Sequence, residues 1–70
     1  MKDENLKIEK QVWVKTPSNR DYSIDRHKGK DGKPDYYVLT EHKASGGRYR
    51  VMILAPDLLK VANALIEASR

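Results

Sequence analysis

The segment DYYVLTEHKASGGRYRVMIL, residues 35–54, constrains the fold more than any other part of the chain. It holds two runs of strand-forming residues on either side of a turn-forming ASGG, a pattern typical of a β-hairpin. Tyrosine, lysine and arginine are interleaved with aliphatic residues in both arms of the hairpin. The sheet therefore either has an ordinary solvated face here or presents this face to a polyanion.

Two further strands are predicted before the hairpin, and a helix after it. Residues 6–16, LKIEKQVWVKT, alternate between apolar and polar with a period of two, and residues 20–27 do the same after a TPSN turn. A KGKDGKP loop then leads into strands over 36–43 and 48–55. Pro56 suits the first turn of a helix, and DLLKVANALIEASR continues it without a breaker. We therefore expect an α+β fold, a four-stranded antiparallel sheet followed by one C-terminal helix (ββββα) that lies across one face.

The size of the chain favours association with a second copy. At 70 residues it corresponds to one domain, for which we expect a flexible N-terminal tail over 1–5 and a single folded unit over 6–70. A chain this short buries only about 60% of its unfolded surface, and it has no cysteine for a disulfide or a Cys-based zinc site. Apolar residues cover about half of the helix circumference at 100° per residue, which is wider than a single sheet requires. The predicted dimer interface comprises Leu58, Leu59, Ala62, Leu65 and Ile66.

Positive charge is concentrated in two places. The formal net charge is +4, and cations cluster in RHKGKDGK, residues 26–33, and in HKASGGRYR, residues 42–50. Such clusters are compatible with contacts to phosphates. For any single loop cation a solvated loop is the simpler interpretation, so the prediction depends on the clusters as a whole.

The pairing of the hairpin decides which cations share a face. If residues 44–47 form the loop, Lys43 faces Arg48, and two like charges lie directly opposite, which is destabilising. Either these charges serve a ligand or both side chains extend into water. This pairing assigns Tyr36, Val38, Thr40 and His42 to the face on the helix side. On the other face it places Tyr37, Leu39, Glu41 and Lys43 of the first strand beside Leu54, Met52, Arg50 and Arg48 of the second. A change of one residue in loop length would mix the two faces.

Trp13 lies between Lys7 and Lys15 on an otherwise polar strand face. It either stacks on an unpaired base, an interaction of about 1–3 kcal/mol, or packs at the sheet edge or in a dimer seam. Both interpretations remain open from the sequence.

The residues give no support for catalysis. Asp21 and Asp25 lie about 13 Å apart at ordinary strand rise, too far for a catalytic dyad. His27 has no carboxylate or nucleophile at a spacing that indicates a catalytic pair. The segment GKDGKP lacks the spacing of a Walker A loop. We expect no enzymatic activity, no cofactor and no metal site.

The N-terminus lacks the apolar region of a signal peptide, and the longest apolar run is far too short to span a membrane. We expect a cytoplasmic protein, with association with the nucleoid as a further option.

With these elements identified, three features resemble the PUR-repeat family, particularly its short bacterial members, over about residues 10–68. They are the ββββα order, the segment RDYSIDRHKGKDGKPDYYVLTEHK and the segment GRYRVMILAPDLLKVANALIEA. Members of that family bind single-stranded DNA and RNA, and their repeats pair within or between chains. The resemblance implies a single repeat that forms an intertwined homodimer. The chain has no phenylalanine, a residue that family members tend to place on these strands. The Whirly and positive-cofactor-four groups share the same layout.

We therefore expect non-enzymatic binding of single-stranded DNA or RNA by a dimeric sheet. The resemblance implies backbone contacts from cations of the sheet and stacking by Trp13 and Tyr37. The predicted nucleic-acid-binding residues are Trp13, Lys15, Arg20, Lys28, Lys30, Tyr37, Lys43, Arg48 and Arg50. The alternative is a protein-interaction or assembly module, such as a small bacterial or phage accessory protein, with Trp13, Met52 and Leu54 as its patch. The sequence leaves open DNA or RNA, any base preference and the pathway.

Overall fold

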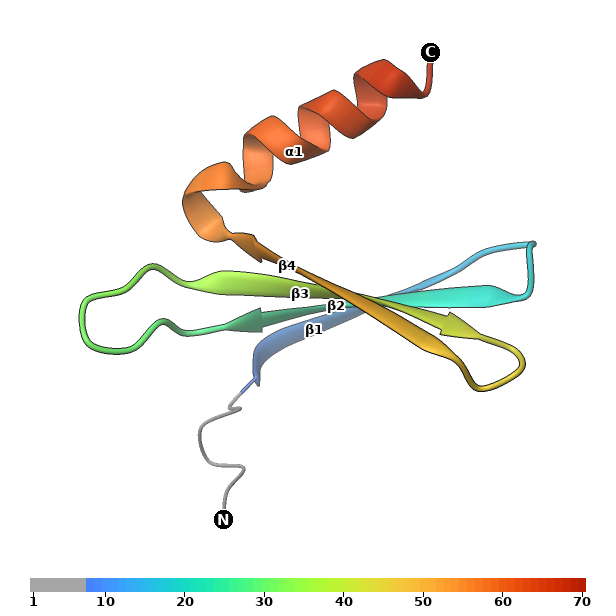
Figure 1. Ribbon diagram of the computed structural model, residues 1–70, viewed down its shortest axis with the longest axis horizontal. Coiled ribbons are helices and arrows are strands. Elements are labelled where there is room, and N and C mark those ends of the chain that lie inside the picture. Colours follow the sequence, from blue (N-terminus) through green and yellow to red (C-terminus); the bar gives the residue numbers. More distant parts are fainter. Residues whose placement is uncertain (1–7) are drawn as a thin grey trace.

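Four β-strands followed by one helix make up the computed structural model of the chain, which describes residues 8–70 (Figure 1). The strands form one antiparallel sheet in the order β1-β2-β3-β4. The predicted α+β class and ββββα order are confirmed, whereas the predicted tail over 1–5 lies outside the described residues. The elements are β1 (Ile8–Lys15), β2 (Arg20–His27), β3 (Tyr36–Lys43), β4 (Arg48–Leu54) and α1 (Ala55–Ala68).

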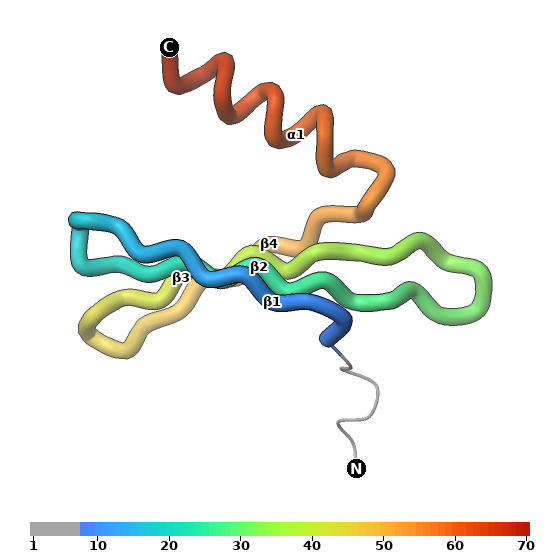
Figure 2. The backbone as a smooth tube through the Cα atoms, turned by 180° about the vertical axis from the view of Figure 1, so that it is seen from behind, coloured from blue at the N-terminus to red at the C-terminus, as the bar shows by residue number. Residues whose placement is uncertain are grey.

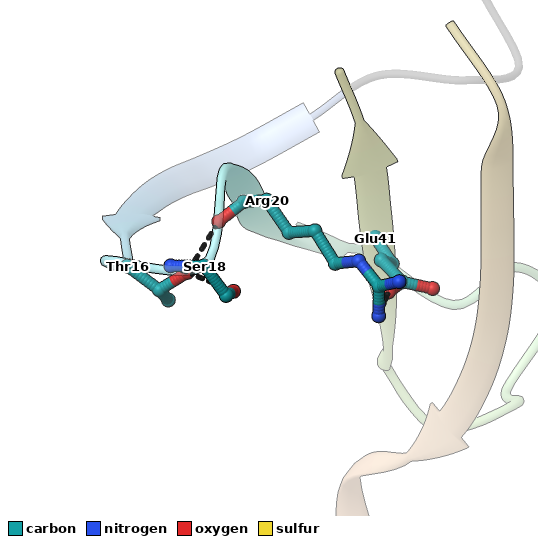
Figure 3. A network of polar contacts seen from close by, with 4 residues as sticks. All are labelled: Thr16, Ser18, Arg20 and Glu41. Atoms are coloured by element: carbon teal, nitrogen blue, oxygen red, sulfur yellow. Dashed lines mark hydrogen bonds and ion pairs between the residues drawn. The ribbon is translucent and has the colours of Figure 1, made fainter. Parts of the chain in front are cut away.

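The turn between β1 and β2 is closed by polar side chains. The Thr16 hydroxyl donates to the carbonyl oxygen of Arg20 at 2.7 Å and lies 2.8 Å from the Ser18 hydroxyl (Figure 3). Asn19 takes a left-handed backbone angle, φ 64°, which asparagine tolerates better than most residues. The TPSN segment therefore reverses the chain as its composition predicts.

The hairpin of β3 and β4 differs by one residue from the predicted pairing. Lys43 and Gly47 close the turn, with the Lys43 N–H donating to the Gly47 carbonyl at 2.9 Å, and Gly46 takes φ 100°. This is a three-residue loop that needs a left-handed residue at its last position, which glycine supplies without strain. His42, rather than Lys43, therefore faces Arg48, and the predicted pairing of two like charges is wrong.

Cross-strand pairing assigns each side chain of the sheet to one of two faces. The aliphatic face is named after a row of aliphatic residues that crosses all four strands. The tryptophan face is the opposite one, named after the neighbouring row, which contains Trp13. The aliphatic row is Val12, Ile24, Leu39 and Val51. The tryptophan row is Trp13, Ser23, Thr40 and Arg50.

Helix α1 extends away from the end of β4 and covers neither face of its own sheet (Figures 1 and 2). The strand continues into the helix at Ala55 without a loop that could turn the chain back, and the Ala55 N–H donates to the Asp35 carbonyl at 2.8 Å. No residue of α1 is buried, nor is any hydrophobic side chain within residues 8–70. The prediction that the helix lies across its own sheet is therefore wrong for the single chain.

In the described part of the chain, no helix combines the length and the apolar character that crossing a bilayer requires.

Replacing Gly29 by alanine should destabilise the loop between β2 and β3. A Cβ at this position would overlap the carbonyl oxygens of Lys33 and Pro34, so the loop would have to shift. We expect Gly29→Ala to lower the free energy of unfolding by about 1–3 kcal/mol, measured by thermal denaturation. Gly47→Ala is the matched control, because its Cβ would meet only the Lys43 side chain, at 3.4 Å. Equal midpoints for the two variants would contradict the expected overlap.

Candidate functional site

The tryptophan face is organised around the ring of Trp13, which is 51% exposed. The indole on β1 reaches across β2 and stacks on His42 of β3, with ring centroids 4.8 Å apart and an interplanar angle of 29°. Its N–H donates to Oε1 of Gln11 at 3.0 Å. On β2, the strand between β1 and β3, the small Ser23 is buried, and its hydroxyl is 2.9 Å from Nε2 of His42. Trp13 is thus held in one orientation with half of its surface open.

A groove of 370 Å³ opens beside these rings, on the same face. At its far end the rings of His27 and Tyr36 stack, 5.0 Å apart at 10°. Asp25 lines the groove and accepts a hydrogen bond from Nε2 of Gln11 at 2.7 Å. Flat aromatic walls combined with a carboxylate acceptor suit a planar ligand that carries hydrogen-bond donors.

Two arginines of β4 extend the tryptophan face toward its edge. Arg48 and Arg50 are both exposed and pair with His42 and Thr40 across the sheet. Within residues 8–70 neither guanidinium makes a hydrogen bond or an ion pair. Lys15, on the same face, has only a 4.0 Å contact with Asp21. These cations are therefore available to an external anion.

Three of the predicted binding residues lie on the opposite face, and each has a partner in its own chain. Arg20 donates to the Glu41 carboxylate at 3.1 Å (Figure 3). The Lys43 ammonium lies 4.5 Å above the ring of Tyr49. Tyr37, the third, has the guanidinium of Arg26 5.9 Å above its ring.

The predicted set is therefore divided between two faces. The structure brings together Trp13, Lys15, Arg48 and Arg50 and separates them from Arg20, Tyr37 and Lys43. The predicted grouping of Arg48 and Arg50 with Tyr37 and Lys43 is wrong, because the one-residue change in the hairpin moves every β4 side chain to the other face. The predicted position of Glu41 on the same face as Arg50 is wrong for the same reason, because Tyr49 rather than Arg50 faces Glu41.

Sequence reasoning missed the partners of Trp13. His42 was assigned to a face covered by the helix, but it lies beside the tryptophan. Gln11 gave no signal of its own, and Asp25 was considered only as a partner of Asp21. Only the pairing of β1 with β2 places Gln11 opposite Asp25.

Lys28 and Lys30 lie in the loop between β2 and β3, which a carboxylate holds in shape. Asp35 accepts hydrogen bonds from the Gly29 N–H and from Nη2 of Arg26, both at 3.0 Å. These bonds stabilise the charged form and lower the pKa of Asp35, with the Gly29 N–H as the larger cause. The hydrogen bond to the carboxylate in turn raises the pKa of Arg26.

The predicted interface residues all lie on α1. Within the single chain Leu58 and Ala62 are partly exposed, while Leu59, Leu65 and Ile66 are 70%, 62% and 54% exposed. The described chain therefore leaves the last three largely uncovered.

No protein family matches this sequence, and no curated protein or solved structure is detectably similar to it. The fold defines a ββββα protein with two different sheet faces. One face carries the aliphatic row together with tyrosines and cations such as Arg20, Arg26 and Lys43, which have partners in their own chain. The other carries Trp13 stacked on His42 and the arginines Arg48 and Arg50, which have no acidic partner within residues 8–70.

The lowered pKa of Asp35 predicts a pH-dependent contribution to stability. The contribution is fully present above the unfolded pKa, about 3.9, and is lost as the pH falls through the lower folded pKa. Thermal midpoints of wild type and Asp35→Asn should therefore differ at pH 7 and converge below about pH 4. Asp31→Asn, at an exposed position of the same loop, is the control and should show no such convergence. A difference that is independent of pH would contradict this assignment.

Proposed function

We propose that this protein binds single-stranded DNA or RNA on the tryptophan face, as a homodimer whose copies cover each other's aliphatic faces. The observation that carries the proposal is that a half-exposed Trp13 shares a face with Arg48 and Arg50, which have no acidic partner within residues 8–70. Stacking on an aromatic ring contributes about 1–3 kcal/mol per base. Arginines that contact phosphates release counterions and add affinity that does not depend on base sequence.

A single strand fits this face better than a duplex. Stacking requires a base that has left its own stack, and the groove beside Trp13 has a carboxylate that can accept hydrogen bonds from a base edge. In a duplex the base faces are already stacked on their neighbours, and the pairing edges are already hydrogen-bonded to the other strand.

The second copy is proposed because the single chain leaves two apolar surfaces uncovered. On the sheet, Val12 and Val51 of the aliphatic row are 43% and 55% exposed. The other surface is the apolar stripe of α1, which extends away from its own sheet (Figure 2). A two-fold symmetric pair offers each helix the aliphatic face of the other chain, so that one interface covers both surfaces. Three cations of this face, Arg20, Arg26 and Lys43, are already engaged within their own chain, which lowers the cost of covering them. A fourth, Lys10, lies on the edge strand β1.

This proposal agrees with the resemblance to PUR repeats. We further propose that the chain is a single PUR-like repeat, with the layout that the Whirly group shares. It assigns the protein a cytoplasmic role with no catalytic step and no cofactor. The residues proposed for binding are those of the tryptophan face and the lysines of the adjacent loop.

A protein-interaction module is the second candidate, favoured by the exposure of Met52 (62%) and Leu54 (40%) on the same face. Purified protein that carries nucleic acid supports the first candidate. It would be seen as a high ratio of absorbance at the nucleic-acid maximum to absorbance at the protein maximum. Recovery of a protein partner that survives nuclease treatment supports the second.

Neutralising the two arginines should weaken binding and flatten its salt dependence. In titrations with single-stranded oligonucleotides, the logarithm of the association constant should fall as salt rises. For Arg48→Gln/Arg50→Gln the slope should decrease by roughly 1.4, because each phosphate contact on a single strand contributes about 0.7. Lys60→Gln/Arg70→Gln, outside the tryptophan face, removes the same charge and should leave the slope nearly unchanged. Binding that is absent, or indifferent to salt, would overturn the proposal.

Removing the indole should lower affinity without changing the salt slope. Trp13→Ala should bind roughly 10- to 100-fold more weakly, corresponding to one lost stack of about 1–3 kcal/mol. Anisotropy of a labelled oligonucleotide measures this without relying on tryptophan emission. Trp13→Phe keeps an aromatic face and should retain most of the affinity. Equal binding by wild type and Trp13→Ala would show that no base stacks there.

A further inference from the structure

The groove beside Trp13 has a neighbour at each end, on the same face of the sheet. A groove of 540 Å³ lies at the loop between β2 and β3 and shares Tyr36 with the central groove. A groove of 330 Å³ lies at the turn after β1 and shares His42 with it. Tyr36 and His42 are on the same strand and the same face. The three grooves therefore follow one another along β3.

We infer that these grooves form one continuous track, parallel to the strands, that holds about four nucleotides of a single strand per chain. This inference rests on the proposed function and adds the path and the site size. From Tyr36 to His42 the track is about 20 Å long at ordinary strand rise. This length places it at the lower end of the range known for sheet-based single-strand sites, about 4–16 nucleotides.

Charge is distributed along the track in a way that separates phosphates from bases. Cations lie at both ends: Lys28 and Lys33 line the loop groove, and Lys15 lines the turn groove together with Asp21, which is 4.0 Å from it. In the central groove, Arg50 of β4 lies on one side of β3 and the carboxylate of Asp25 on β2 lies on the other. Asp25 repels phosphate but accepts hydrogen bonds from N–H groups of bases. The phosphates of the strand are therefore held at the ends of the track and on its β4 side, and the base edges face Asp25.

The loop groove offers a second position for a base. Its floor is apolar, formed by Tyr36, Met52 and Leu54, beneath the lysines of the loop. The ring of Tyr36 is backed by His27, in the same way that Trp13 is backed by His42. Two supported rings, one in each groove, provide stacking surfaces for bases at separate points of the strand. The exposed Met52 and Leu54 then serve as the floor of this subsite.

The length of the track can be measured with an oligothymidine series from two to twelve nucleotides. Trp13 is the only tryptophan of the chain, so its emission reports directly on the central groove. We expect affinity to rise at least tenfold from two to four nucleotides. Beyond four nucleotides, affinity should rise only in proportion to the number of overlapping four-nucleotide sites that the oligonucleotide offers.

Two variants outside the central groove test the path. Lys33→Gln should weaken binding of the four-nucleotide oligomer about fivefold at 0.1 M salt, since one phosphate contact contributes about 0.7 to the salt slope. Tyr36→Leu should weaken it by a similar or larger factor, with circular dichroism to verify the fold. Lys60→Gln on α1 is the charge-matched control and should bind as wild type does.

The outcomes separate this inference from the proposed function. If Lys33→Gln and Tyr36→Leu bind as tightly as wild type while Trp13→Ala binds weakly, the track is wrong and the proposed function stands. Affinity that grows from four to twelve nucleotides by much more than the number of overlapping sites also overturns the track. If no oligonucleotide binds at any length, both fall.

Discussion

In the proposed dimer, burial of the aliphatic row that crosses the sheet is the interaction on which the rest of the structure depends. Complete burial of one valine, leucine or isoleucine contributes roughly 1.5–3 kcal/mol, and a chain of this size has little else to stabilise it. Within residues 8–70 no hydrophobic side chain is fully buried, so the single chain leaves much of this energy unused, above all at Val12 and Val51. In the proposed dimer the apolar stripe of α1 covers the row. The opposite face then stays in water, where Trp13, Arg48 and Arg50 are free to meet a ligand.

The elements of this fold could be predicted from the sequence, but their pairing could not. Alternation with a period of two located the strands, and Pro56 marked the start of the helix, because both signals are local. The hairpin register depended on which residue of ASGG takes the left-handed conformation, and either glycine can do so without strain. Gly46 takes it, the loop has three residues rather than four, and Arg48 and Arg50 move to the side of Trp13. One backbone angle thus decides which cations share a face.

The candidate site was predictable in part, for a related reason. Trp13 stood out because a large ring on a polar strand face is unusual, and the cations stood out because they cluster. That Trp13 lies on His42, or that Gln11 links it to Asp25, follows only from the pairing of three strands. The width of the apolar stripe indicated that the helix has a large apolar neighbour, but not that its own sheet is left uncovered. Here the strand runs directly into the helix, which extends away from the sheet (Figure 1).

The mass of the protein in solution tests the central claim most directly. Sedimentation equilibrium at tens of micromolar should give twice the chain mass of 8.1 kDa. Val51→Asp, which places a charge in the middle of the aliphatic row, should abolish the dimer and the folded circular dichroism spectrum together, because neither forms without the other. A wild-type protein that is monomeric at this concentration, with a folded spectrum and a sharp thermal transition, would contradict the account.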